Sequence, residues 1–175
     1  LSQRPELHNS PERCVALAAV AYFALWSAQS KDALEIGNDI LEMAERDQNQ
    51  YLTWAAHSLL GSTLALRAEL TSARSHLNKA LDGYEARSPD QLDLVIGGGV
   101  DVVSLCLRAM VLWLLGYPGQ ASDDLKRALA LARASTYSSA LGFAQSAAGI
   151  LLFLLGRDPE AARHQVEGLR LLREE

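Results

Sequence analysis

Small side chains recur at a regular spacing along this chain of 175 residues, and their recurrence restricts the folds that it can adopt. Any side chain larger than a methyl group holds two closely crossing helices apart, so glycine and alanine mark the crossings. The recurrence therefore predicts pairs of tightly packed helices, repeated along the chain. The predicted packing residues are Ala21, Ala33, Gly61, Ala73, Ala80, Ala109, Ala121, Ala128, Gly149, Ala161 and Gly168.

The amino-acid composition favours helices over strands throughout the chain. The strong helix formers leucine and alanine number 32 and 27, whereas the β-branched residues valine and isoleucine together number 12. Hydrophobic residues make up 49% of the chain and charged residues 21%, which is enough apolar material to bury a core. We therefore predict an all-α fold, and disorder is excluded for most of the chain.

Each repeat predicts a first helix, a short turn and a second helix that runs back along the first. Gly116 precedes Pro118, and Gly156 precedes Pro159, as expected where one helix ends and the next begins. Four antiparallel pairs stacked in order form an α–α superhelix, or solenoid. The predicted pairs span residues 11–28 with 31–47, 50–68 with 71–87, 100–115 with 119–134, and 138–155 with 159–173.

The spacing of the repeats bears on the domain organisation. One linker, between Arg87 and Val100, is longer than the others and contains the chain-breaking run Gly97-Gly98-Gly99. This linker is either a domain boundary or an insertion, and the resumed register beyond it favours an insertion within one domain, residues 1–175. Because the chain opens on leucine, we expect a fragment of a longer polypeptide. The predicted repeats cover about residues 11–48, 50–87, 97–134 and 137–175.

Two stretches carry a resemblance to a known family. The sequence Leu-Gly-Tyr-Pro-Gly-Gln-Ala at 115–121, followed by Leu-Ala-Leu-Ala-Arg at 129–133, resembles tetratricopeptide repeats (TPR). The segment 105–133, especially 111–118, is similar to the helical repeats that follow the ATPase module in bacterial signalling ATPases of the adenylate or guanylate cyclase and transcription-regulator type. The resemblance implies a TPR-like regulatory module within a larger bacterial signalling protein.

Charge and targeting signals exclude several classes of ligand and location. The net charge of −5 lacks the basic surface that phosphate backbones require, which argues against nucleic acid. The polar N-terminus, with Pro5 and Pro11, is unlike a secretory or transit segment, so we expect a cytoplasmic protein. Cys14 and Cys106 are predicted to be reduced core residues. The uncharged segment 137–156 is long enough for a membrane span, but its serines and glycines favour a soluble helix.

The chain shows no convincing constellation of catalytic or metal-binding residues. His8, His57, His76 and His164 lack a metal-binding spacing and are interpreted as solvated or structural. The glycine run fits neither a phosphate-binding loop nor a dinucleotide fingerprint. Arg108 lies among apolar neighbours, and we interpret it as a snorkelling or ion-paired side chain. We therefore predict no enzyme activity, no cofactor and no metal.

The first helices of a TPR-like stack line its concave side, which makes that side the predicted binding groove. Lysine, arginine and asparagine are missing from its positions, which excludes a clamp for a peptide carboxylate. An apolar concavity either marks binding or is ordinary core between repeats, and both interpretations stay open. Its predicted residues are Ala18, Tyr22, Trp26, Ser58, Ser62, Leu66, Cys106, Met110, Trp113, Ser146, Ile150 and Phe153.

Two classes of function fit these features. The first is a non-catalytic interaction module whose groove binds a protein or peptide segment, another domain of the parent chain, or a second copy in a homodimer. The second is a small-molecule sensor that controls an attached ATPase, cyclase or transcription-regulator output. The first is favoured, and a third class, a helical enzyme, lacks a credible acid, base or nucleophile.

Overall fold

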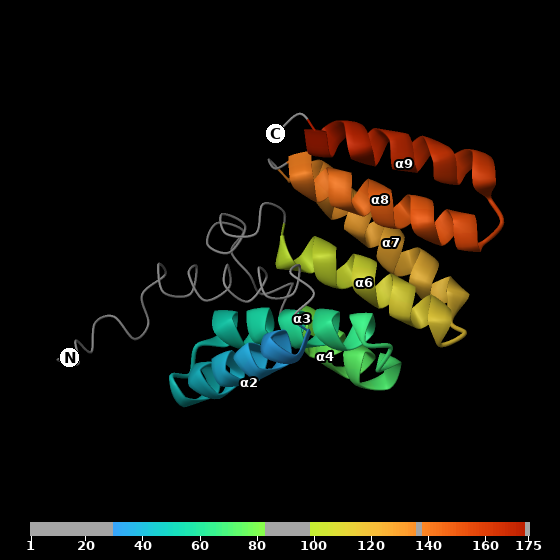
Figure 1. Ribbon diagram of the computed structural model, residues 1–175. Coiled ribbons are helices and arrows are strands. Elements are labelled where there is room, and N and C mark those ends of the chain that lie inside the picture. Colours follow the sequence, from blue (N-terminus) through green and yellow to red (C-terminus); the bar gives the residue numbers. More distant parts are fainter. Residues whose placement is uncertain (1–29, 83–98, 136–137, 174–175) are drawn as a thin grey trace. The chain divides into compact units, whose positions relative to one another are not determined.

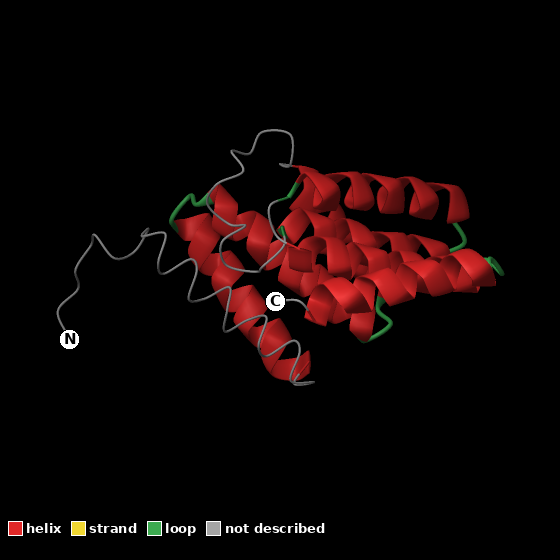
Figure 2. Ribbon diagram, turned by 90° about the horizontal axis from the view of Figure 1, so that it is seen from above, coloured by secondary structure: helices red, strands yellow, loops and turns green. Residues whose placement is uncertain are grey.

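The computed structural model describes residues 30–82, 99–135 and 138–173. These residues form seven helices and no strand, which confirms the all-α fold class (Figure 1, Figure 2). The predicted helix at 11–28, with Ala18, Ala21, Tyr22 and Trp26, lies outside the described residues, as do His8 and Cys14. The helices are α2 (Ser30–Arg46), α3 (Gln50–Leu66), α4 (Leu70–Asp82), α6 (Val100–Leu114), α7 (Pro118–Ala134), α8 (Ser138–Leu154) and α9 (Asp158–Arg173).

Turn residues explain why the helix boundaries could be predicted. Each described helix begins within one residue of its expected start. Gly116 and Gly156 adopt positive φ values of 87° and 71°, a conformation that glycine reaches without strain and that ends α6 and α8. Pro118 occupies the first turn of α7, where its missing N–H would have no helical partner. Local chemistry therefore sets these boundaries.

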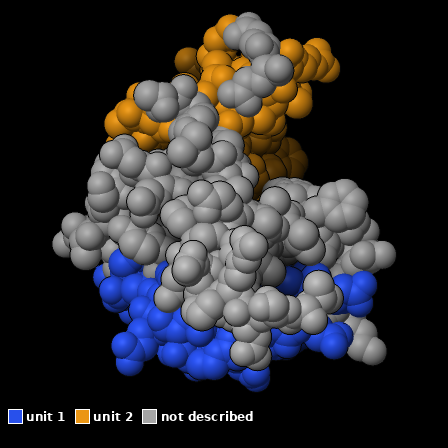
Figure 3. Space-filling model, turned by 90° about the vertical axis from the view of Figure 1, so that its left-hand side faces the viewer, with its two compact units in different colours: residues 1–96 blue, residues 97–175 orange. Residues whose placement is uncertain are grey.

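The chain divides into two compact units, residues 1–96 and 97–175 (Figure 3). In the first unit, α2 packs on α3, and α3 packs on α4. In the second unit, α6 packs on α7 and α8 on α9, while α8 also contacts both α6 and α7. The α3–α4, α6–α7 and α8–α9 pairs are hairpins joined by short turns (Figure 1). The single domain and the four-pair TPR solenoid stay predictions.

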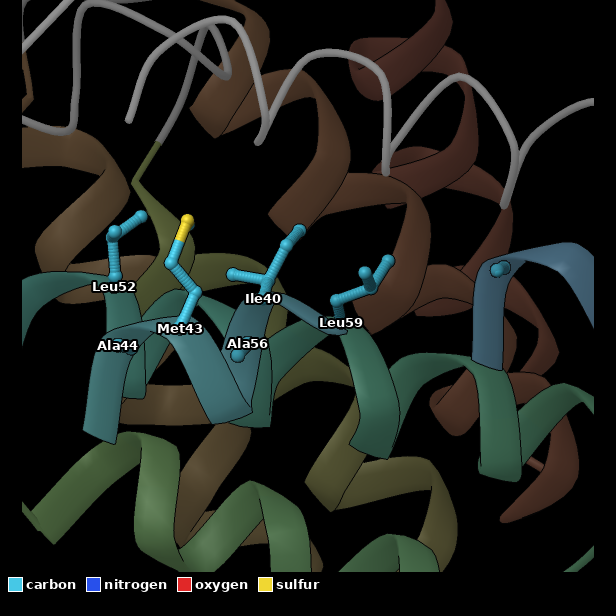
Figure 4. Packing of buried hydrophobic residues seen from close by; sticks show 7 residues of the cluster. Ile40, Met43, Ala44, Leu52, Ala56 and Leu59 are labelled. Carbon is cyan, nitrogen blue, oxygen red and sulfur yellow. The ribbon is translucent and has the colours of Figure 1, made fainter. Parts of the chain in front are cut away.

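The core of the first unit begins with α2, whose apolar residues recur every three or four positions. Ile40, Met43 and Ala44 of this helix join a buried cluster with residues of α3 (Figure 4). Such spacing puts the apolar side chains on one face, and their removal from water stabilises the packed pair. The buried members of the cluster are Ala33, Ile40, Met43, Ala44, Leu52, Ala56 and Leu59.

The predicted packing residues within the described part of the chain are all buried. Several of them lie at helix crossings. A methyl group on Gly61 would lie 2.7 Å from Leu77 Cγ, and one on Gly168 would lie 2.9 Å from the carbonyl oxygen of Gly142. Both distances are shorter than van der Waals contact, so the small residues set how closely α3 approaches α4 and α8 approaches α9.

Two glycine substitutions test this packing. Gly168→Ala is expected to lower the free energy of unfolding by about 2 kcal/mol, because the backbone of α8 blocks the added methyl group. Gly119→Ala is the matched control. Apart from its own helix backbone and its chain neighbours, nothing lies within 4 Å of its added methyl group, so the higher helix propensity of alanine should stabilise the protein by about 0.5 kcal/mol. Urea unfolding measures both changes, and a Gly168→Ala variant as stable as Gly119→Ala would contradict the close approach.

Candidate partner-binding surface

The structure places the predicted groove residues in three environments. Three are buried, namely Ser58, Ser62 and Cys106. Three are partly buried, namely Met110, Trp113 and Ser146. Three are exposed, namely Leu66, Ile150 and Phe153. Ile150 and Phe153 are thus exposed apolar side chains of α8, whereas Ser58, Ser62 and Cys106 are buried among the helices.

Backbone hydrogen bonds explain how hydroxyl groups are accommodated inside α3. Ser62 donates its hydroxyl hydrogen to the carbonyl oxygen of Ser58 at 2.7 Å, and Thr63 donates to that of Leu59 at 2.8 Å. A buried hydroxyl without such a partner would be costly. These short side chains therefore act as small core residues with satisfied polar groups.

Cys106 is a buried free cysteine, as predicted. Burial, followed by the nearby Asp124 carboxylate, raises the pKa of its thiol to about 12. The thiolate is the nucleophilic and metal-binding form of cysteine, and this pKa keeps the thiol protonated near neutral pH. The surroundings of Cys106 thus favour a packing role.

An exposed apolar surface covers one side of the α8–α9 hairpin. Ile150 directly follows Gly149, which contacts α9, and Leu169 directly follows Gly168, which contacts α8. Because the two helices are antiparallel (Figure 1), one residue beyond each contact glycine points to the same side of the hairpin. We call this surface the α8–α9 apolar face. Its large residues, each 41% to 69% exposed, are Ile150, Phe153, Leu154, Val166, Leu169 and Leu172.

The opposite flank of α9 is polar. An open pocket of about 360 Å³ lies there, and His164 Nδ1 forms a hydrogen bond with Gln145 Oε1 at its wall. A hydrogen bond and ion pair with Arg170 lower the pKa of the Glu167 carboxyl. α9 therefore separates a charged flank from an apolar one. The pocket is lined by Gln145, Glu160, Arg163, His164 and Glu167.

A polar pair joins the two helices in each of the α3–α4, α6–α7 and α8–α9 hairpins. Arg108 donates hydrogen bonds from Nε and Nη2 to the two carboxylate oxygens of Asp124, at 2.7 and 2.8 Å. This finding confirms the ion-paired interpretation of Arg108. In the α3–α4 hairpin the pair is His57 with His76, whose Nδ1 atoms lie 3.1 Å apart. Gln145 and His164 form the pair in the α8–α9 hairpin.

The His57–His76 pair titrates at unusually low pH. Burial, then the positive charges that His76 and Lys79 can carry, lower the pKa of His57 from 6.5 to about 4. Burial, followed by Lys79, also lowers the pKa of His76. One Nδ1 must donate the hydrogen bond and the other accept it, so at least one ring is neutral, and the lowered pKa values favour the neutral form of both rings near pH 7. A structural role for these two histidines follows.

The described residues offer neither a metal cluster nor a helix that could span a membrane. Within residues 30–82, 99–135 and 138–173, no group of three or more His, Cys, Asp or Glu is arranged to hold a metal ion. No helix in the same ranges has both the length and the apolar character needed to cross a bilayer. No protein-family model and no curated protein matches the chain.

Sequence reasoning missed both the α9 half of the apolar face and the polar pairs. The prediction that the first helices line the binding side leaves out Val166, Leu169 and Leu172, which lie on a second helix. The repeat register contains a signal for the polar pairs, because His76, Asp124 and His164 occupy the same position in successive second helices. Comparing polar residues across repeats therefore points to one member of each pair, and to both members in the α3–α4 and α8–α9 hairpins, where His57 and Gln145 are also equivalent.

Proposed function

We propose that this chain is a non-catalytic protein-interaction module that binds an apolar segment of a partner on the α8–α9 apolar face. The observation that carries the proposal is the exposure of six large apolar side chains on one side of a single hairpin. Contiguous apolar patches of this kind on soluble proteins usually mark sites of interaction. The TPR-like repeat pattern supports the same class of function, because stacked hairpins commonly present extended binding surfaces.

The different polarity of the two flanks of α9 indicates which flank a partner would contact. Charged residues line the pocket on one flank, whereas the other flank offers Val166, Leu169 and Leu172 to solvent. Burying a partner's apolar side chains against the second flank removes water from both surfaces. The charged flank stays hydrated at the edge of the contact, as polar rims do in protein interfaces.

A peptide-display selection tests the proposed function. Immobilised full-length chain should enrich peptides with apolar residues, and Leu169→Glu should weaken their binding at least about tenfold, because it places a charge in the apolar contact. Arg163→Glu, on the opposite flank of the same helix, is the matched control and should leave affinity within about twofold. Failure to enrich any binder, or binding that tolerates Leu169→Glu, would contradict the proposal.

A further inference from the structure

The positions that form the α8–α9 apolar face have equivalents in the α6–α7 hairpin, and most of these equivalents are less exposed. A shift of 40 residues brings one hairpin onto the other in the repeat register. At four of the six positions of this face, the equivalents in α6 and α7 are buried or only partly exposed; Ala132, for example, is 2% exposed and Leu172 46%. These four are Met110 with Ile150, Trp113 with Phe153, Leu129 with Leu169, and Ala132 with Leu172. The other two equivalents, Leu114 for Leu154 and Lys126 for Val166, are exposed.

We attribute the lower exposure of the α6–α7 hairpin to α8, which packs against it. This helix packs on both α6 and α7, as well as on its own partner α9. Gly142 and Gly149 of α8 face α9, and Ile150 and Phe153 face solvent. The stripe left to meet α6 and α7 carries small residues spaced by four and ends in leucine. Its members, all at most 1% exposed, are Ala140, Ala144, Ala148 and Leu151.

The side chains in the contact of α8 with α6 and α7 indicate what kind of helix fits the exposed α8–α9 apolar face. The α6–α7 hairpin is contacted by α8 on both of its helices, and the buried stripe of α8 that remains for this contact consists mainly of alanines. Small residues at every fourth position let the incoming helix approach closely, while the hairpin supplies the bulk that fills the contact. The α8–α9 apolar face carries large apolar side chains at the corresponding positions.

A second copy of the chain is a poorer complement. In any copy, the alanine stripe of α8 is already packed against α6 and α7 of that copy. If the α8–α9 apolar faces of two copies met, Ile150, Phe153 and Leu169 of one copy would pack against the same large residues of the other. This arrangement lacks the pairing of large with small side chains that the α8 contact shows.

We propose that the α8–α9 apolar face receives a single α-helix of a partner protein, and that this helix presents alanine or another small residue at every fourth position toward the face. The helix contacts both α8 and α9, as α8 contacts both α6 and α7. This inference rests on the proposed function and specifies the partner that the surface accepts.

Two synthetic helices test the partner's chemistry. The first has the 17-residue length of α8, stabilised as a helix by side-chain bridges, with three alanines spaced by four and a leucine on one face and lysine and glutamate elsewhere. The second is identical except that leucine replaces the three alanines. Isothermal titration against the full chain should show the alanine helix binding at least about tenfold more tightly, since leucines would hold the helices apart. Leu169→Glu should abolish the difference, and Arg163→Glu should preserve it.

The outcomes separate this inference from the proposed function. Equal binding of the two helices, or tighter binding of the leucine helix, would overturn the small-residue requirement while leaving a protein-binding surface in place. Binding of neither helix would also overturn it, and the display selection would then decide the proposed function on its own. A dimer in light scattering that Leu169→Glu dissociates would show that a second copy occupies the face, which would overturn the partner helix.

Discussion

Replacing Asp124 with alanine is expected to lower the free energy of unfolding by about 3 kcal/mol, the largest effect of any substitution considered above. Asp124 is only 7% exposed at its side chain and binds Arg108 through both carboxylate oxygens. Removing it leaves a guanidinium group, itself 17% exposed, without its carboxylate partner in the α6–α7 hairpin. Chemical denaturation of wild type and variant at neutral pH measures the loss.

The neighbouring Asp123 is a matched control for this experiment. Its carboxylate is 73% exposed and pairs with the equally exposed Lys126. Solvent weakens such surface pairs, so Asp123→Ala should change stability by no more than about 0.5 kcal/mol. Similar effects of Asp123→Ala and Asp124→Ala would show that the Arg108 pair contributes no more than a surface contact.

A double substitution separates the cost of leaving Arg108 without its carboxylate from the contribution of the Arg108–Asp124 pair itself. The position of Arg108 in the repeat register holds the buried Leu60 in the α3–α4 hairpin, so an apolar side chain fits there. Arg108→Leu combined with Asp124→Leu should therefore be within about 1 kcal/mol of wild type. A double variant as unstable as Asp124→Ala alone would show that the polar pair is needed for the hairpin to pack.

Acidification is expected to destabilise the protein through His57. The folded chain protonates this ring near pH 4, whereas the unfolded chain does so near pH 6.5, so the unfolded state binds more protons between these values. The stabilisation is fully present above pH 6.5 and is lost as the pH falls to about 4. With allowance for solvent screening, the pKa difference corresponds to a loss of about 2 kcal/mol, measured as the free energy of unfolding in urea across this range.

His57→Gln isolates the contribution of the histidine pair. Glutamine is the natural residue at the equivalent position, where Gln145 binds His164, so the variant should keep a hydrogen bond to His76 and should fold. Its stability should fall by about 2 kcal/mol less than that of wild type over the same pH interval. Parallel profiles for wild type and His57→Gln would contradict the low pKa of the ring.

Helix positions and helix crossings were predictable because they depend on local chemistry and on a repeated spacing. Glycine before proline marks the α6–α7 and α8–α9 turns, and all of the small residues predicted to pack are buried where the structure describes them. The same register could have matched His76 with Asp124 and His164. The register could not show that Arg108 binds Asp124 in the α6–α7 hairpin. Arg108 lies one helical turn beyond the position that is equivalent to His57.

The sequence by itself therefore determined an all-helical chain, the ends of its helices and the residues at which those helices touch, because turn chemistry and side-chain size act over short distances. Only the tertiary structure decided which apolar residues are covered. Met110 and Ile150 occupy the same place in the repeat, yet the second is exposed at 42% while the first is partly buried. The difference arises because α8 packs over the α6–α7 hairpin, and exposure depends on such neighbours, which no local pattern contains.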